Sequence, residues 1–163
     1  MIKNKMQKAH LFFLFCLMIL SAGCQPDYFF DKTEEIPNDI WTYEYQPEFT
    51  VEIEDTMALY DIMINIRHTR FYGYRNLWVY VHTLMPDGEK LENKVELPLS
   101  EPSGRWYGNC SGDICFVQVP IQMKAIFKEA GSYTFRIQQY MRVPELEHIL
   151  GVGLRLEKSG ERP

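Results

Sequence analysis

The sequence predicts an all-β protein: an antiparallel β-sandwich, of jelly-roll or immunoglobulin-like type, with about seven or eight strands and at most one short helix. Several short segments alternate apolar with polar residues, which is the period of a strand that buries one face. Turn signals rich in glycine and proline separate these segments at short intervals. Only one segment has the composition of a helix, and it is too short to form a layer of its own.

Three strands are predicted in the first half of the domain, at residues 49–54, 60–67 and 77–84. In each, β-branched and aromatic residues recur at every second position, and both residue types favour strands. Residues 68–75 connect the second strand to the third and form an aromatic and cationic loop, with Gly73 as its pivot.

A hairpin is predicted after the third strand. Residues 85–88 have the sequence Met-Pro-Asp-Gly, in which Pro86 restricts one backbone φ and Gly88 accepts the positive φ that other residues resist. This turn connects the strand that ends at Leu84 to a strand at residues 90–97.

The second half of the domain begins with a predicted long loop, residues 98–112, which contains two prolines and three glycines. A strand follows at residues 114–121, and Pro120 either ends it or restricts it to a sheet edge. Residues 122–129 are helix formers but are too few for more than about two turns. The last strands are predicted at residues 133–140 and 152–158.

The amino terminus has the features of an export signal. Three lysines precede ten consecutive apolar residues, Leu11–Leu20, which as a helix would rise about 15 Å, roughly half the hydrocarbon thickness of a bilayer. The run is followed by Ser21-Ala22-Gly23-Cys24, and small residues before a cysteine resemble the cleavage box of bacterial lipoproteins. We therefore predict cleavage before Cys24 and lipidation of this cysteine. The alternative is an ordinary signal peptide with an incidental cysteine.

Cleavage at this site divides the chain into four parts. Large apolar residues, Trp41 among them, are too frequent in the second part for a pure linker, so some of it is expected to dock on the domain. The parts are a signal peptide at 1–23, a lipidated tether and docking arm at 24–46, the β-sandwich at 47–158 and a disordered tail at 159–163.

The mature chain is acidic. Three of the 17 lysines and arginines and none of the 22 acidic residues lie in the signal, so 14 basic and 22 acidic residues remain, a net charge of about −8. Basic residues are interspersed with acidic ones and form no stripe that could follow a phosphate backbone. The composition argues against a nucleic-acid partner, and membrane attachment is expected to come from the lipid.

Two cysteines remain in the domain, Cys110 and Cys115. An exported protein meets an oxidising compartment, so we expect a disulfide that closes a loop around Ser111-Gly112-Asp113. A zinc site is one alternative, but it needs four ligands, and the histidines of the mature chain are scattered without ligand spacing. Two free thiols are the other alternative.

The sequence lacks the motifs of common catalytic sites. It contains no glycine-rich phosphate loop, no Gly-x-Ser-x-Gly elbow and no His-Glu-x-x-His pair. Acidic residues are numerous, but the sequence does not bring two of them to a working separation, so we interpret them as solvated surface. We therefore expect no enzymatic activity, no cofactor and no metal.

Aromatic residues make up 14% of the chain, and several fall in predicted loops or in the arm. If exposed, they would anchor a protein partner or stack on sugar rings; if buried, they would cap the ends of the core. The candidate binding surface consists of Trp41, Phe71, Tyr72, Tyr74, Trp106 and Tyr107.

A series of motifs extends from about Trp41 to Glu157. It includes Asn65-Ile-Arg67, Arg75-Asn76-Leu77-Trp78-Val79, Pro86-Asp87-Gly88, Gly104-Arg105-Trp106-Tyr107-Gly108 and Leu150-Gly-Val-Gly-Leu-Arg-Leu-Glu157. In order and spacing these motifs resemble the GldH-type gliding-motility lipoproteins of the Bacteroidetes, and the position of Cys24 agrees with them.

The resemblance implies a small lipoprotein of the cell envelope, associated with gliding and its secretion-linked machinery in motile members, without known enzymatic activity. We therefore expect a lipid-anchored interaction protein at the outer membrane, with other envelope proteins as partners. The alternative is a carbohydrate-binding surface lipoprotein of a nutrient-uptake system, with a glycan as its ligand.

Overall fold

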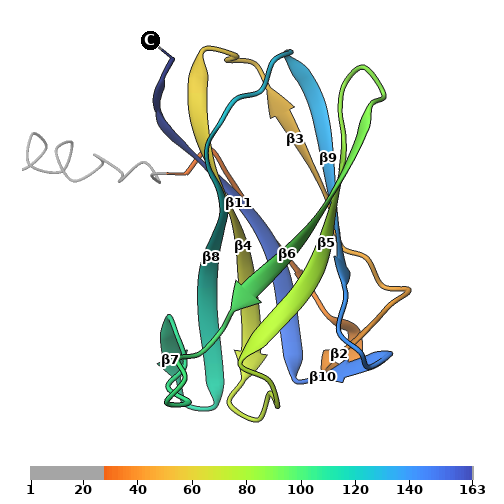
Figure 1. Ribbon diagram of the computed structural model, residues 1–163, viewed down its shortest axis with the longest axis vertical. Helices are drawn as coiled ribbons and strands as arrows, with labels where there is room; N and C mark the ends of the chain where they lie inside the picture. The colour runs from red at the N-terminus through yellow and green to blue at the C-terminus, as the bar shows by residue number, and fades with distance from the viewer. Residues whose placement is uncertain (1–27, 163) are drawn as a thin grey trace, which may run out of the picture.

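Two antiparallel β-sheets pack face to face in the computed structural model, which describes residues 28–162 (Figure 1). The first sheet has the order β1 (Phe30–Glu35), β11 (Ile149–Glu161), β4 (Ala58–Thr69), β8 (Ile114–Ala125) and β7 (Asn109–Ser111). The second has the order β3 (Glu48–Ile53), β9 (Gly131–Gln139), β5 (Asn76–Leu84) and β6 (Lys90–Pro98). A separate ribbon joins β2 (Ile40–Thr42) to β10 (Glu145–Glu147), and a 3-10 turn, η1 (Pro37–Asp39), precedes β2.

This architecture confirms the predicted all-β sandwich. The predicted signal peptide and the lipidation site at Cys24 lie outside the described residues. Among residues 28–162, no helix has the length and hydropathy needed to cross a membrane.

The core lies between the sheets and is built from alternate strand positions. In β3 the residues Phe49, Val51 and Ile53 are buried, and those between them are exposed. The same alternation places Leu77 and Val79 of β5 inside. Burying one such side chain contributes about 1.5–3 kcal/mol relative to leaving it in water, so the period decides which face of each strand turns inward.

The predicted hairpin joins β5 to β6, with Leu84 paired to Lys90. Gly88 has a φ of 87°, and its N–H donates to the carbonyl of Met85 at 3.0 Å. The turn therefore adopts the conformation that its glycine predicted.

The helix formers at residues 122–129 do not form a helix, because β8 continues to Ala125. Ala125 is buried and pairs with Tyr60 of β4. Pairing and burial together outweigh the weak helix propensity of this segment. Pro120 lies beyond Phe116, the last residue of β8 that β7 pairs, so it occupies a sheet edge as predicted.

The last strand is longer than predicted. It extends to Glu161, which pairs with Ala58 at the start of β4, so residues 159–161 belong to the sheet and not to a disordered tail. A register shift between Lys158 and Gly160 interrupts the regular alternation, which explains why the sequence pattern ends before the strand does.

The predicted arm supplies an edge strand to the first sheet. Strand β1 pairs with β11 from Phe30, opposite Leu156, to Glu35, opposite Gly151. Four of its six residues are exposed, so no apolar alternation marks it as a strand. Strand β1 is therefore held to the sheet largely by backbone pairing, whereas Ile36 and Trp41, further along the arm, are buried in the core.

The first described residues and the loop between β4 and β5 lie toward opposite ends of the sandwich (Figure 1). Phe29 packs against Tyr60 near the start of β4, with their ring centroids 5.4 Å apart. From Tyr60 to Thr69 the strand rises about 30 Å before the loop begins.

Candidate binding surface

Two loops and a hairpin converge at the end of the sandwich that lies away from Phe29 (Figure 1). They are residues 70–75 between β4 and β5, residues 99–108 between β6 and β7, and the hairpin of β7 and β8. We call this region the loop end. It contains five of the candidate aromatic residues, namely Phe71, Tyr72, Tyr74, Trp106 and Tyr107.

Backbone hydrogen bonds hold the segments of the loop end together. The N–H of Arg70 donates to the carbonyl of Asp113 at 2.8 Å, which joins the first loop to the hairpin. The N–H groups of Leu99 and Ser100 donate to the carbonyl of Arg75 at 2.8 and 3.0 Å. These bonds connect residues far apart in the sequence, so the whole fold positions the loops.

Gly108 allows the second loop to pass close to β8. Its φ of 72° lies in the left-handed region, and a Cβ atom would lie 2.1 Å from the carbonyl oxygen of Phe116. Any side chain at this position would displace the backbone. Glycine is therefore required at position 108 for the loop that carries Trp106 to pack against β8.

Cys110 of β7 and Cys115 of β8 face each other in the strand pairing, and a disulfide joins them. Cys115 is buried and Cys110 is half-buried. The bond closes the hairpin around Ser111-Gly112-Asp113, the segment for which the sequence predicts a closed loop. It restrains the hairpin that forms one rim of the loop end.

An aromatic cluster lies beneath the loops. Trp106 is half-buried, and its ring centroid lies 4.5 Å from that of His68 and 6.4 Å from that of Tyr72. The Tyr72 hydroxyl donates to the carbonyl of Asn76 at 3.0 Å, and burial raises the pKa of this hydroxyl well above its usual range. Tyr72 is therefore a packed, neutral residue.

His68 is fully buried beside Trp106. Its Nδ1 lies 2.8 Å from the carbonyl oxygen of Thr69, so this nitrogen carries the proton and donates. Among the described residues, Nε2 has no hydrogen-bond partner. Burial lowers the pKa of the ring, so His68 is neutral at about pH 7.

The structure corrects the predicted binding surface at two positions. Trp41 is fully buried, and its Nε1 donates to the carbonyl of Tyr45 at 2.8 Å; Tyr72 is buried as well. Both rings fill the core, which is the usual place for large aromatic groups. The exposed members are Phe71, Tyr74 and Tyr107, at 67%, 42% and 39% exposure.

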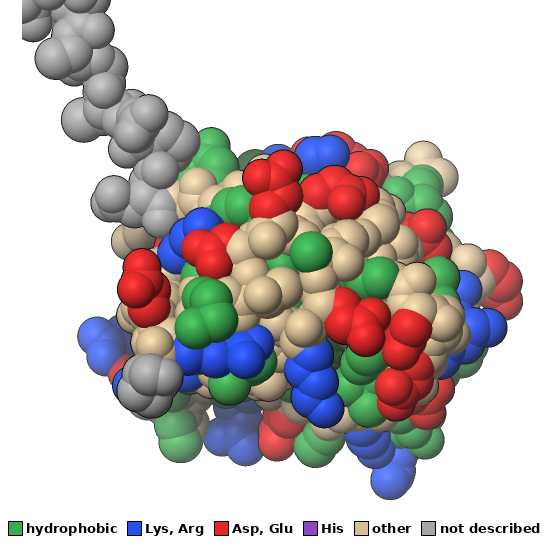
Figure 2. All heavy atoms as spheres, turned by 90° about the horizontal axis from the view of Figure 1, so that it is seen from above, with side chains coloured by type: hydrophobic (Ala, Val, Ile, Leu, Met, Phe, Trp, Pro, Cys, Tyr) green, Lys and Arg blue, Asp and Glu red, His purple; other side chains and the backbone are tan. Residues whose placement is uncertain are grey.

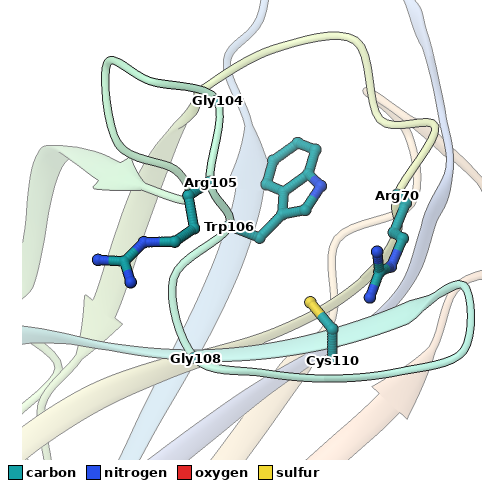
Figure 3. A pocket seen from close by; sticks show the side chains of 6 residues that line it. All are labelled: Arg70, Gly104, Arg105, Trp106, Gly108 and Cys110. Atoms are coloured by element: carbon teal, nitrogen blue, oxygen red, sulfur yellow. The ribbon is translucent and has the colours of Figure 1, made fainter.

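The first of two hollows at the loop end has a volume of about 410 Å³ (Figure 3). Arg105 pairs with Glu101, and its side chain points away from Trp106. The Arg70 guanidinium points toward Cys110, and among the described residues no carboxylate pairs with it. The residues that line the hollow are Arg70, Gly104, Arg105, Trp106, Gly108 and Cys110.

The second hollow, of about 450 Å³, lies between the first loop and the end of β6. Tyr74 and Arg75 line it beside polar groups, and the side-chain amide of Asn76 donates to the Glu96 carboxylate at 2.6 Å. Gly73, Pro98, Ser100 and Pro102 complete the lining.

Another aromatic cluster lies on the outer face of the four-stranded sheet, outside the predicted surface. The rings of Tyr80 and Tyr140 are 4.6 Å apart, and Lys94 Nζ lies 4.8 Å from the Trp78 ring and 4.3 Å from that of Tyr140. The sequence indicates this cluster, because Trp78 and Tyr80 alternate with buried aliphatic residues and therefore lie on the outer face of β5. No local sequence pattern indicates the position of Arg70 beside Trp106, because that position depends on contacts between distant loops.

Comparison with solved structures gives distant likenesses. The chain is similar to TmCBM61 in complex with beta-1,4-galactotriose, with a TM-score of 0.40 and 9% identity over 82% of this chain and 91% of that one. It is also similar to a carbohydrate-binding module specific for non-crystalline cellulose, with a TM-score of 0.41 and 7% identity over 82% of this chain and 73% of that one. At this distance the likenesses say nothing about ligands.

Sequence comparison gives a closer relationship. A protein of Christiangramia forsetii named gliding motility lipoprotein GldH homolog is 32% identical over 94% of this chain and 99% of its own length. The gliding motility lipoprotein GldH of Flavobacterium johnsoniae is 26% identical over 86% of this chain and 91% of its own length. Residues 28–156 match the family described as GldH lipoprotein. As its motifs predicted, the chain belongs to the GldH lipoprotein family.

Proposed function

We propose that this protein is a lipid-anchored, non-catalytic component of the cell envelope that binds another envelope protein through its loop end. Family membership supports the lipid anchor, and the names of the relatives, gliding motility lipoproteins, support a role in machinery of that kind. The predicted lipid site, Cys24, lies four residues before Tyr28, the first described residue. The proposal places the anchor in the outer membrane.

The separation of the two ends of the sandwich carries this proposal. With a lipid on Cys24, the end that contains Phe29 is held at the membrane. The loop end, about 30 Å further along β4, then projects away from the membrane. The anchored end, seen from above, has acidic and basic side chains interspersed (Figure 2). The anchor and the binding surface therefore do not compete for the same face.

The side chains at the loop end are of the kinds that dominate protein interfaces. Phe71, Tyr74 and Tyr107 are exposed aromatic residues, and Arg70 and Arg75 add cationic groups. Tyrosine, tryptophan and arginine are enriched at binding hot spots. Confinement to a membrane also raises the effective concentration of neighbouring envelope proteins, so a weak patch is enough to hold a complex.

The test is purification of the tagged lipoprotein from its native envelope in mild detergent, followed by identification of stoichiometric partners. We expect a protein partner whose recovery falls in the Phe71→Ala/Tyr74→Ala variant. The control Met57→Ala/Leu91→Ala removes other exposed apolar side chains, located before β4 and at the start of β6, and should retain the partner.

Recovery of the wild-type protein as a lone monomer would contradict the proposal. A reproducible hydrolytic activity that is lost on changing one acidic residue would replace it with an enzymatic function.

A carbohydrate-binding role is the second candidate, favoured by the hollow beside Tyr74. A sugar site needs an aromatic platform next to converging polar groups, and Tyr74 lies beside Asn76 and Glu96. A glycan array tests this role directly. A clear hit that is lost in both Tyr74→Ala and Glu96→Gln would support it, and an array without hits would dismiss it.

A further inference from the structure

We infer that the hollow between Arg70 and Trp106 is a binding site for a carboxylate, supplied by an acidic side chain of the partner protein. The inference rests on the proposed function and names the chemistry by which the loop end recognises its partner.

Two hydrogen-bond donors line this hollow. The Arg70 guanidinium carries several N–H groups, and the indole nitrogen of Trp106 lies on the edge of the ring that faces Arg70 (Figure 3). Among residues 28–162, neither side chain donates a hydrogen bond to the protein. A single planar group with two acceptor oxygens would satisfy both donors.

The lining of the hollow is basic although the protein is acidic. It includes Arg70 and Arg105 and no aspartate or glutamate. Arg105 is neutralised by its ion pair with Glu101, so Arg70 supplies the positive charge that is open to a ligand. The mature chain has a net charge of about −8 and repels an acidic partner over most of its surface. The positive charge of Arg70 attracts an acidic side chain locally, at this hollow.

The geometry favours a peptide carboxylate over a phosphate or a sugar. Two donors match the two oxygens of a carboxylate and would leave oxygens of a phosphate without partners. The His68 ring packs edge-on against the half-buried indole of Trp106 at 4.5 Å, and the indole nitrogen lies on the side toward Arg70, where a carboxylate would contact both groups. The volume of about 410 Å³ admits an acidic side chain.

The three tryptophans allow a direct test by NMR of the indole N–H groups, in the full mature lipoprotein in detergent micelles. Trp41 is buried, with its Nε1 hydrogen-bonded to the carbonyl of Tyr45, and Trp78 lies beside Lys94 on the outer face of the four-stranded sheet. At low salt, a blocked oligoglutamate peptide should shift the Trp106 signal alone, in a saturable way. An oligoglutamine peptide of equal length should shift none of the three.

The variant Arg70→Gln removes the charge and leaves the indole in place. Because the Arg70 side chain makes no hydrogen bond within the described residues, the fold should persist, as an unchanged Trp41 signal would show. Loss of a charge-assisted hydrogen bond is expected to weaken peptide binding about tenfold. The control Arg136→Gln removes the same charge from an exposed position on β9 and should bind like the wild type.

Three outcomes would overturn the carboxylate site: no response of Trp106 to oligoglutamate, equal binding by Arg70→Gln, or a response at Trp78 that places the acid at Lys94. Tighter binding of oligogalacturonate than of oligoglutamate would overturn the peptide assignment. Failure of the proposed function is measured separately, by copurification. If the Arg70→Gln protein still copurifies with the partner, the interaction role stands, but the hollow beside Arg70 is not where the partner binds.

Discussion

The carboxylate of Asp31 on β1 accepts a hydrogen bond from the side-chain amide of Asn65 on β4 at 3.0 Å, although β11 lies between the two strands. The contact passes over Gly153, which pairs with Thr33 on one side and Asn65 on the other. Asn65 also accepts a hydrogen bond from Gln118 of β8 at 2.9 Å. A glycine in β11 thus lets polar side chains connect the docked arm to the strands beyond it.

Removal of the Asp31 carboxylate should destabilise the fold. Asn65 is buried and would keep an unsatisfied donor, and Arg155 would lose one of its two carboxylate partners. We expect Asp31→Ala to lower the free energy of unfolding by about 1–3 kcal/mol, measured by urea denaturation. The control Glu34→Ala changes an exposed residue of the same strand and should stay within about 0.5 kcal/mol of the wild type. Equal stability of both variants would show that the bond contributes nothing.

A side chain at Gly153 should weaken the docking of β1. A Cβ atom there would lie 2.5 Å from Thr33 Oγ1 and 2.7 Å from the Lys32 carbonyl oxygen. Gly153→Ala is expected to cost about 1–3 kcal/mol and to speed amide hydrogen exchange in Phe30–Glu35. In Gly73→Ala the added Cβ meets no heavy atom within 4 Å, so exchange should not change. Unchanged exchange in the Gly153 variant would contradict the account of this contact.

The disulfide should contribute modestly to stability. It closes a short loop, so the loop-entropy relation gives about 2 kcal/mol for its loss in Cys110→Ser/Cys115→Ser. A reductant should lower the stability of the wild type by a similar amount and leave the variant unchanged. Exported protein purified without reductant should be lighter than the reduced form by the mass of two hydrogens, and free thiols in that preparation would refute the bond.

The stability of the fold should fall as His68 becomes protonated. The unfolded ring binds a proton near its ordinary pKa of 6.5, whereas burial holds the pKa of the folded ring below that value. The neutral ring therefore contributes its full share of stability above about pH 6.5. As the pH falls below 6.5, the free energy of unfolding decreases by up to about 1.4 kcal/mol per pH unit until the pH reaches the pKa of the folded ring. Urea unfolding between about pH 7.5 and pH 5.5 measures this slope. His68→Gln should flatten it, and a wild-type profile as flat as that of the variant would argue against the buried neutral ring.

Lipidation should depend on Cys24. We expect Cys24→Ala protein to leave the detergent phase in phase partitioning, because no other feature of the chain is predicted to attach it to a membrane. Cys16→Ala, which changes the other cysteine of the amino-terminal segment, should partition like the wild type. A processed Cys24→Ala protein that still enters the detergent phase would refute the lipid anchor.

The inner strands could be predicted from the sequence because burial of one face is recorded in the local period. Phe49, Val51 and Ile53 lie two apart and all turn inward, and Gly88 marks the turn that its conformational freedom allows. The motifs were equally informative about the family. Local signals were insufficient where pairing with a distant strand decided the conformation, as in β8, which continues as a strand to Ala125 although residues 122–129 are helix formers.

Composition and period alone determined that the chain forms a sandwich rich in aromatic residues, but only the tertiary structure decided which of those residues form a surface. Trp41 and Tyr72 are buried, whereas Trp106 lines a hollow with Arg70. The physical reason is that local sequence records the preference of a residue for burial, while its neighbours depend on contacts between distant segments. The close approach of Gly108 to β8 and the bond from the Arg70 N–H to Asp113 are contacts of this kind.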